Sequence, residues 1–362
     1  MASVAEDDRK RGFQRIVKSQ RVKFLFVLGF LGALGALAFN SRAADQVKGV
    51  SLAHLHRRGM GYGSDDCRAQ LKAIADVGAN WIAIADFGFM SSVTDPHIKF
   101  GGDRSLTEAD LVKCIDDAHA TGLKVLLKPD IWCHDFSRLK KWHGDIAMTS
   151  EADWDIWFAD YTRFILHHAQ LAQSAKADGF CVGMELEGTS RQEARWRAVV
   201  SEVRKVYTGP LTYAAAYGEW PHIQWWDAVD CIGVNGYFPL TGKESTDEAD
   251  LRRGWAVVYG FLEPFAKKWN KPICFTELGY SESVRAGLEP WEYNVVGSDK
   301  EYQARLYRIA VEEAAKRDFI VGIFAWKWFT SDQGPRMERH DPFGIQDRPL
   351  VLDALRRAWK KP

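Results

Sequence analysis

From residue 49 onwards, short apolar runs alternate along the chain with longer segments in which apolar residues recur at helical spacing. A run of about five apolar residues between two helical segments is typical of a strand in a parallel sheet, because helices cover both faces of such a sheet. Eight runs have this pattern, at residues 49–53, 81–85, 124–128, 180–185, 211–216, 231–237, 273–277 and 322–326. Eight strands with helices between them predict a closed parallel (β/α)8 barrel, the TIM barrel.

Polar residues and glycines mark the expected ends of several helices. Three helical segments begin like a capping box, in which a serine or threonine precedes an acidic residue by three positions. These segments start at Thr107, Ser190 and Ser298. Glycines that favour a helix C-terminus follow three segments, at Gly78, Gly122 and Gly179. Because no linker or further repeat interrupts the alternation, we expect one domain over residues 46–362.

The main alternative to a barrel is an open, doubly wound sheet, which has the same alternation of strands and helices. A nucleotide-binding sheet of that kind carries a glycine-rich turn directly after its first strand. Here His54 and His56 follow the first predicted strand, and Gly59 and Gly61 come too late to form that turn. The sequence therefore favours the barrel and predicts no nucleotide cofactor. The His, Cys and carboxylate residues also lack the spacing of a metal site, so no metal is expected.

Two glutamates close predicted strands: Glu185 ends the fourth apolar run and Glu277 ends the seventh. In a barrel, the carboxyl ends of the strands carry the active site. Retaining glycoside hydrolysis needs two carboxyl groups about 5–5.5 Å apart, one to protonate the leaving oxygen and one to attack the anomeric carbon. We therefore interpret Glu185 and Glu277 as a catalytic pair. The alternatives are that either glutamate caps a helix or forms a surface ion pair, and that Glu187 replaces Glu185 as the acid.

Other polar and aromatic residues near strand ends are candidates for binding a substrate. Tyr237 is suited to hold a neighbouring carboxylate ionised by donating a hydrogen bond from its phenol. Lys128 and Asp130 follow the third strand, where they either bind sugar hydroxyls or form a structural ion pair. His54 is either a ligand or a packing residue. Trp142 lies in a long loop after the third strand, where subsites commonly form.

Fifteen tryptophans are an unusually large number for 362 residues. Indole rings stack on the apolar faces of sugar rings, but they also fill large cores, and we expect about half of those near strand ends to be structural. Those near strand ends are Trp132, Trp142, Trp220, Trp225, Trp226, Trp326 and Trp328. Lys plus Arg and Asp plus Glu number 48 each, so no net charge favours nucleic acid as a partner. A neutral carbohydrate substrate fits this balance.

The first 45 residues have the composition of an export segment. A basic region precedes residues 24–39, which are apolar and uncharged, and small residues follow at 41, 43 and 44. This order predicts a signal peptide, with an uncleaved membrane anchor through residues 24–39 as the alternative, its basic end in the cytoplasm. Both interpretations place the rest of the chain in the periplasm or outside the cell. The six cysteines show no spacing typical of a disulfide framework.

Five short motifs make the chain resemble a known group of enzymes. They lie at residues 182–186, 213–218, 225–227, 232–237 and 275–280. Together they resemble clan A glycoside hydrolases, and most closely glycoside hydrolase family 113, whose characterised members are β-mannanases. The likeness extends over nearly the whole chain after residue 46. It implies a barrel that hydrolyses glycosidic bonds without a cofactor.

The resemblance also implies roles for individual residues. Glu185 would be the acid/base and Glu277 the nucleophile. Tyr237 would lie near the nucleophile, and Trp326 would form the floor beneath the sugar at the cleavage point. Asn235, in the motif that ends the sixth strand, is expected among the substrate-binding residues.

In one position the chain departs from the clan. Many clan A members have asparagine directly before the acid/base, where it contacts the sugar 2-hydroxyl, and this chain has Met184. Either another residue makes that contact, or the preference at that sugar differs.

From these features we expect a retaining glycosidase of a β-linked polysaccharide or oligosaccharide. The resemblance favours β-1,4-mannan, with β-glucan or xylan as alternatives. A noncatalytic carbohydrate-binding barrel is a second alternative, which the presence of both glutamates disfavours. A hydrolase with a nucleophile triad would need a G-x-S-x-G turn, which the sequence lacks.

Overall fold

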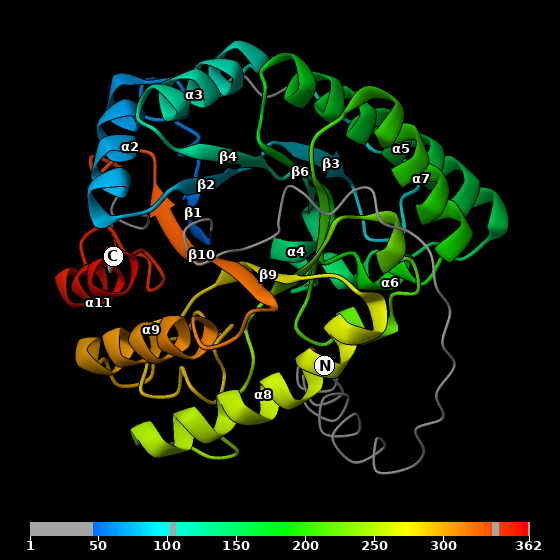
Figure 1. Cartoon of the computed structure of the whole chain (residues 1–362). Helices are drawn as coiled ribbons and strands as arrows, with labels where there is room; N and C mark the ends of the chain where they lie inside the picture. Colours follow the sequence, from blue (N-terminus) through cyan, green and yellow to red (C-terminus); the bar gives the residue numbers. More distant parts are fainter. Residues whose placement is uncertain (1–45, 102–105, 335–339, 361–362) are drawn as a thin grey trace, which may run out of the picture.

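Eight parallel strands close into a barrel in the computed structural model, which describes residues 46–101, 106–334 and 340–360 (Figure 1). Each strand pairs with the next along the barrel, and the last pairs with the first. In chain order the strands are β1 (Val47–Ala53), β2 (Trp81–Ile84), β4 (Lys124–Leu127), β6 (Gly179–Met184), β7 (Leu211–Ala215), β8 (Cys231–Asn235), β9 (Ile273–Leu278) and β10 (Ile320–Phe329). Every apolar run predicted as a strand overlaps one of them, so the predicted (β/α)8 fold is confirmed.

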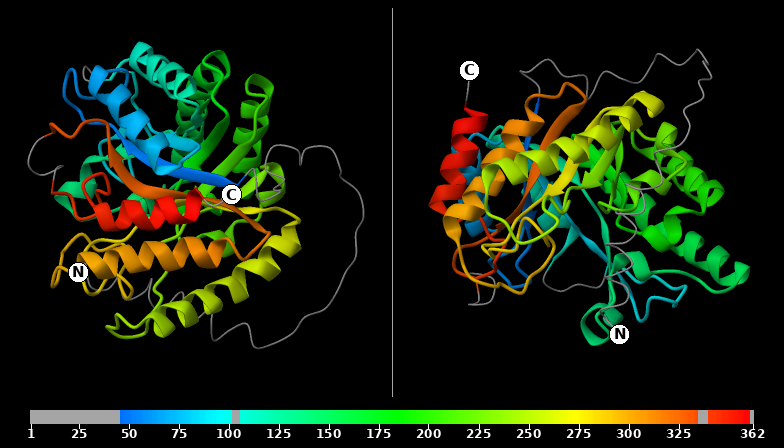
Figure 2. Two further views of the ribbon diagram at one scale, coloured as in Figure 1. Left: turned by 60° about the vertical axis from the view of Figure 1, so that its left-hand side comes forward. Right: turned by 90° about the horizontal axis from the view of Figure 1, so that it is seen from below.

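Long α-helices surround the barrel and cover the outer faces of its strands (Figures 1 and 2). They are α2 (Asp65–Val77), α3 (Glu108–Ala120), α5 (Glu151–Ser174), α7 (Glu193–Val206), α8 (Glu248–Trp269), α9 (Lys300–Ala314) and α11 (Pro349–Trp359). The large apolar cluster of the protein lies between these helices and the strands. A separate cluster, which includes Trp81, Met184 and Phe324, fills the inside of the barrel. The barrel is thus a packed core, and its chemistry must lie at the strand ends.

The connection between β7 and β8 departs from the regular pattern. It contains two short 3-10 helices, η3 (Trp220–His222) and η4 (Trp226–Ala228), in place of an α-helix. Trp225 and Trp226 are fully buried here, and both rings pack against Tyr213 on β7. Tryptophan side chains therefore cover the outside of β7 where a helix would otherwise lie.

A small parallel sheet that the sequence did not predict extends two barrel strands. β3 (Phe87–Met90) follows β2 closely and pairs with β5 (Asp130–Cys133), which follows β4 closely. Pro129 interrupts the ladder between β4 and β5 because proline has no backbone N–H to donate. Three short helices lie beyond these strand ends: α4 (His134–Arg138), η2 (His143–Asp145) and α6 (Glu187–Ser190). The extension carries Asp130 and its neighbours past the barrel end.

One predicted helix start is confirmed, and two lie elsewhere. Thr107 caps α3, and its side chain forms the expected capping box with Asp110. Gln192, rather than Ser190, precedes α7, and its side chain makes no capping hydrogen bond. Ser190 is instead buried at the end of α6. Asp299, rather than Ser298, caps α9 by accepting a hydrogen bond from the Tyr302 N–H.

Two of the three predicted helix stops are confirmed. Gly78 and Gly122 have φ angles of 100° and 84°, which favour glycine. Gly179 is instead the first residue of β6, and Lys176 takes the left-handed conformation after α5. The six cysteines, all within the described residues, are buried free thiols.

The predicted signal peptide or anchor, including residues 24–39, lies outside the described residues. Within residues 46–101, 106–334 and 340–360, no helix is both long enough and apolar enough to cross a membrane.

Candidate active site

Both predicted catalytic glutamates lie at the carboxyl end of the barrel. Glu185 directly follows β6, the fourth barrel strand, and Glu277 lies near the end of β9, the seventh. Asn235 on β8 pairs with Glu277 in the sheet register, and its amide donates a hydrogen bond of 2.9 Å to Glu185 Oε1. The Asn235 amide oxygen accepts a hydrogen bond from Thr276, which fixes the orientation of the amide. Asn235 therefore joins the two glutamates in one site.

Glu277 is held between a cation and a phenol. Its Oε1 forms an ion pair with Lys128 Nζ, and its Oε2 accepts a hydrogen bond of 3.0 Å from the Tyr237 hydroxyl. The side chains of Lys128 and Glu277 are only 4% and 6% exposed. Burial raises the pKa of Tyr237, and the nearby charge of Glu277 raises it further, so the phenol keeps the proton that it donates. Two donors on its two oxygens suit an ionised carboxylate at Glu277.

Glu185 has a different environment and is 18% exposed. Burial raises the pKa of Glu185, and the charge of Glu277 raises it further, against the opposing effects of His143, Asn235 and Lys128. A carboxyl group with a raised pKa is suited to donate a proton. Glu185 also has a φ of 51°, which is uncommon for a residue with a side chain.

His143 and Asp130 complete the charged network, and sequence reasoning did not select His143. Its Nε2 lies 3.3 Å from Asp130 Oδ1, and its Nδ1 lies 4.0 Å from Glu185 Oε2. Burial lowers the pKa of His143, but Asp130, Glu185 and Glu277 outweigh it and raise the pKa to about 9. This raised pKa favours the positively charged form of His143. The only signal in the sequence was its place beside Trp142, in a loop expected to form subsites.

The predicted floor residue, Trp326, lies close to this network on β10. Lys128 Nζ is 5.8 Å from the centre of the indole ring, and Lys327 Nζ is 5.2 Å from it. Lys327 also forms an ion pair with Asp341. The peptide bond between Trp326 and Lys327 is cis. Tyr307 fixes the backbone by donating a hydrogen bond to the Trp326 carbonyl. The structure thus brings five of the predicted site residues together: Trp326, Lys128, Glu277, Tyr237 and Asn235.

The model of Glycoside Hydrolase Family 113 matches residues 50–342. The chain belongs to this family. It is a glycosidase. A comparison with curated proteins gives no match.

Solved structures of family 113 enzymes have the same fold. The β-mannanase AaManA from Alicyclobacillus acidocaldarius, in complex with ManMIm, is 28% identical with a TM-score of 0.77 over 89% of this chain and 98% of that chain. A complex of a family 113 β-1,4-mannanase is 23% identical with a TM-score of 0.77 over 88% of this chain and 100% of that chain. A β-glucuronidase from Ruminococcus gnavus, at 12% identity, shares the fold over 87% of this chain and 50% of its own, with a TM-score of 0.59.

Two predicted site residues of this family 113 chain make local contacts. His54 Nδ1 accepts a hydrogen bond of 3.0 Å from the Tyr62 N–H, and its ring packs against His56 and Tyr62. The Trp142 ring covers Gly144, where an added Cβ would lie 2.2 Å from the indole. Roles of His54 and Trp142 in binding a substrate stay predictions.

The seven tryptophans near strand ends differ in their exposure to solvent. Four of the seven near strand ends are at most 4% exposed: Trp220, Trp225, Trp226 and Trp328. Trp132 is 42% exposed, and it lies two residues from Asp130 on β5, so both side chains share one face of the strand. Its ring contacts Phe136, which in turn contacts His143, at centroid distances of 5.6 and 4.7 Å. An aromatic row therefore leads from His143 to the surface.

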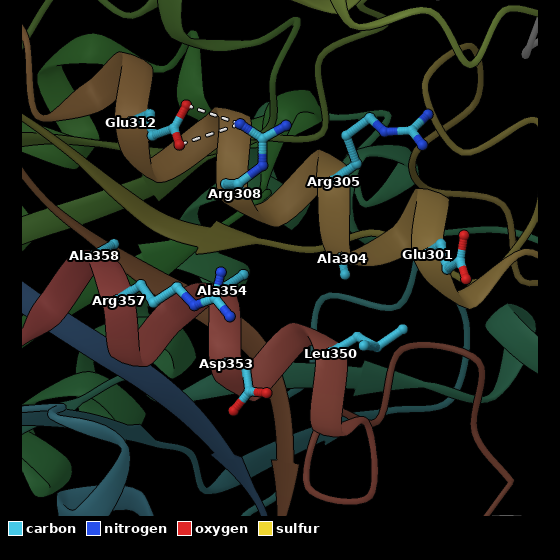
Figure 3. A pocket seen from close by; sticks show the side chains of 10 residues that line it. All are labelled: Glu301, Ala304, Arg305, Arg308, Glu312, Leu350, Asp353, Ala354, Arg357 and Ala358. Carbon is cyan, nitrogen blue, oxygen red and sulfur yellow. Dashed lines mark hydrogen bonds and ion pairs between the residues drawn. The ribbon is translucent and has the colours of Figure 1, made fainter.

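A surface groove of about 640 Å³ lies between α9 and α11, outside the barrel (Figure 3). Its lining contains acidic and basic residues, and Arg308 pairs there with Glu312. Neither candidate catalytic glutamate lines it, so we place the chemistry at the strand ends. Within the described part of the chain, no group of three or more His, Cys, Asp or Glu side chains is arranged to hold a metal ion.

Proposed function

We propose that this glycosidase hydrolyses β-1,4-linked mannan with retention, using Glu277 as nucleophile and Glu185 as acid/base. The observation that carries this proposal is the contrast between the two carboxyl groups. The Glu277 carboxylate accepts hydrogen bonds from Lys128 and Tyr237. Burial and the charge of Glu277 instead raise the pKa of Glu185. One group is thus suited to attack while the other is suited to donate a proton.

In the first step, the Glu277 carboxylate attacks the anomeric carbon. The glycosidic C–O bond breaks, and Glu185 gives its proton to the leaving oxygen. In the second step, Glu185 takes a proton from water, the water oxygen bonds to the anomeric carbon, and the bond to Glu277 breaks. The Lys128 and Tyr237 donors oppose the attack because they stabilise the free carboxylate. They assist its departure in the second step for the same reason.

The charge of Glu277 also adjusts Glu185 between the two steps. While Glu277 is ionised, it raises the pKa of Glu185 and keeps the proton available. Once Glu277 forms an ester, that negative charge is lost and Glu185 becomes more acidic. His143 then stabilises the ionised Glu185 through its own positive charge. The same residue can therefore act first as acid and then as base.

Mannan is the proposed substrate because the 28% identical enzyme AaManA is a β-mannanase. Trp326 offers an indole face near Glu277, and the row from His143 to Trp132 offers aromatic surface on the side of the acid/base. Since Glu185 protonates the leaving oxygen, sugars beyond the cleaved bond would bind along this row. We also propose that the domain acts outside the cytoplasm, which rests on the composition of residues 1–45.

The test is release of reducing sugar from β-mannan, xylan and β-glucan. We expect activity on mannan, and a loss of at least about a thousandfold in Glu277→Gln, because no other group replaces the nucleophile. The matched control is Glu263→Gln, which changes a surface ion pair on α8. It should keep full activity.

Each other outcome has a defined meaning. Activity on another glycan that is lost in Glu277→Gln would change the substrate and keep the mechanism. A folded Glu277→Gln protein that keeps its activity would remove the site assignment. Binding of sugars without any turnover by the parent protein would favour a noncatalytic barrel.

A further inference from the structure

A second buried carboxyl group lies behind Glu185. Glu219, in the connection between β7 and β8, is 0% exposed. Its Oε1 accepts a hydrogen bond of 2.6 Å from the Tyr213 hydroxyl, and its Oε2 accepts one of 2.9 Å from the Ala216 N–H. Burial raises the pKa of Glu219, whereas its hydrogen bonds with Tyr213, Ala216 and Ser190 lower it and so favour the carboxylate. A carboxylate in such a place is unfavourable unless its contacts compensate, so the structure must hold it through them.

The Tyr213 hydroxyl connects Glu219 to the candidate acid/base. Its oxygen accepts a hydrogen bond of 2.8 Å from the N–H of Leu186, the residue directly after Glu185. Because the phenol proton points to Glu219, a lone pair of the same oxygen is left to face Leu186. This hydrogen bond holds the peptide bond between Glu185, which has a positive φ angle, and Leu186. The chain of contacts therefore runs from Glu219 through Tyr213 to the backbone of Glu185.

Two tryptophans hold the backbone of α6, which follows Leu186. The Trp196 indole donates to the Thr189 carbonyl, and the Trp225 indole donates to the Ser190 carbonyl, at 3.1 and 3.0 Å. These two fully buried rings stack at 5.1 Å, and the Tyr213 ring meets both edge-on. Water is thus kept away from the hydrogen bonds behind Glu185, which makes them hard to replace.

We propose that Glu219 is a positioning residue for Glu185. Through Tyr213 and the Leu186 N–H, it sets the direction in which the Glu185 carboxyl group points at the glycosidic oxygen. This inference rests on the proposed function, because it assumes that Glu185 is the acid/base. Glu219 itself touches no substrate and takes no proton in the reaction.

Glu219→Gln tests the contact without changing the volume of the side chain. Its amide NH2 must face either the Tyr213 O–H or the Ala216 N–H, both of which are donors, so one hydrogen bond is lost. The readout compares two aryl substrates, phenyl and 2,4-dinitrophenyl β-mannobioside. Phenolate is a poor leaving group and needs the proton from Glu185, whereas dinitrophenolate leaves without it.

We expect Glu219→Gln to lower kcat/KM for the phenyl substrate about tenfold to a hundredfold, which is part of the roughly 10²–10⁴ that general acid catalysis supplies. The value for the dinitrophenyl substrate should change little, because its cleavage does not use the acid. Tyr213→Phe should show the same selective loss, since it removes the middle of the connection and keeps the ring packing. A general loss of structure would lower both values equally.

Tyr207→Phe is the matched control. Tyr207 is also buried, and its hydroxyl donates 2.8 Å to the Ala177 carbonyl, before the start of β6 at the opposite end of the barrel. Tyr207→Phe should not lower kcat/KM selectively for either substrate. Equal losses on both substrates in folded Glu219→Gln and Tyr213→Phe proteins would overturn the proposal. Turnover of both substrates by the parent enzyme tests the proposed function separately from this inference.

Discussion

The two candidate catalytic glutamates are supported in opposite ways. Glu277 is held by side chains across the end of the barrel, where Lys128 and Tyr237 each contact one oxygen. Glu185 receives one side-chain hydrogen bond from Asn235 and lies 4.0 Å from His143, and the backbone behind it is held through the Leu186 N–H. The first arrangement suits a negative charge, whereas the second raises the pKa of Glu185 and holds the backbone next to it. Two residues of the same type therefore acquire different chemistry from their surroundings.

The largest effect that tests this comparison is expected from Glu185→Gln. Turnover of mannooligosaccharides should fall by about 10²–10⁴, because the leaving oxygen loses its acid. Added azide should restore turnover of an activated aryl mannoside, since azide attacks the intermediate without help from a base. The measurement is the steady-state rate and the yield of glycosyl azide.

Glu187→Gln is the control for that variant, because Glu187 is the competing acid two residues along. It should keep its activity and make no glycosyl azide. If Glu187→Gln were the variant that azide rescues, the acid/base assignment would pass to Glu187.

A second effect concerns the ion pair at Glu277. Lys128→Met should reduce the free energy of unfolding by about 3–5 kcal/mol, because a buried carboxylate loses its partner. Activity should fall as well, since Glu277 loses one of the two donors that hold its carboxylate in place. Denaturant unfolding and kcat/KM measure the two changes.

The double variant Lys128→Met with Glu277→Gln separates the two causes. It should recover much of the lost stability, because no charge is left unpaired, but none of the activity. Additive losses of stability in the double variant would show that the two side chains do not interact as described.

The smallest expected effect is a shift in the pH dependence on replacing His143. The positive charge of His143 lowers the pKa of Glu185, so His143→Gln should raise that pKa. The protonated acid would then persist to higher pH, and the alkaline limb of the pH profile of kcat/KM would move to higher pH. Lys141→Met, a cation in the same loop that pairs with Asp145, should leave the limb in place. A shift of the alkaline limb to lower pH in His143→Gln would contradict the described network.

The strand pattern and the two glutamates could be predicted because both are properties of short segments. Apolar runs of strand length define the barrel, and a carboxylate at the end of such a run is visible in the sequence alone. The sheet of β3 and β5 escaped prediction because each of its strands closely follows a barrel strand, and Pro129 separates β5 from the preceding run.

Two supporting residues, His143 and Glu219, could not be predicted, because their roles depend on contacts between distant segments. His143 meets Glu185 across 42 positions of the chain, and nothing near Glu219 in the sequence indicates a buried carboxyl group. Trp225 and Trp226 were candidates for sugar stacking, but the structure buries both against Tyr213. A tryptophan near a strand end is compatible with either role, and only the covering segments decide between them.

The most direct test of the central claim is to trap the glycosyl-enzyme. Glu185→Gln, mixed with 2,4-dinitrophenyl β-mannobioside, should form the intermediate quickly and hydrolyse it slowly, because the leaving group needs no acid but water needs a base. Mass spectrometry of the intact protein and its peptides should find one mannobiosyl group on the peptide that contains Glu277. An adduct on another residue would contradict the assignment of the nucleophile. Release of an inverted sugar without any adduct would contradict the two-step mechanism.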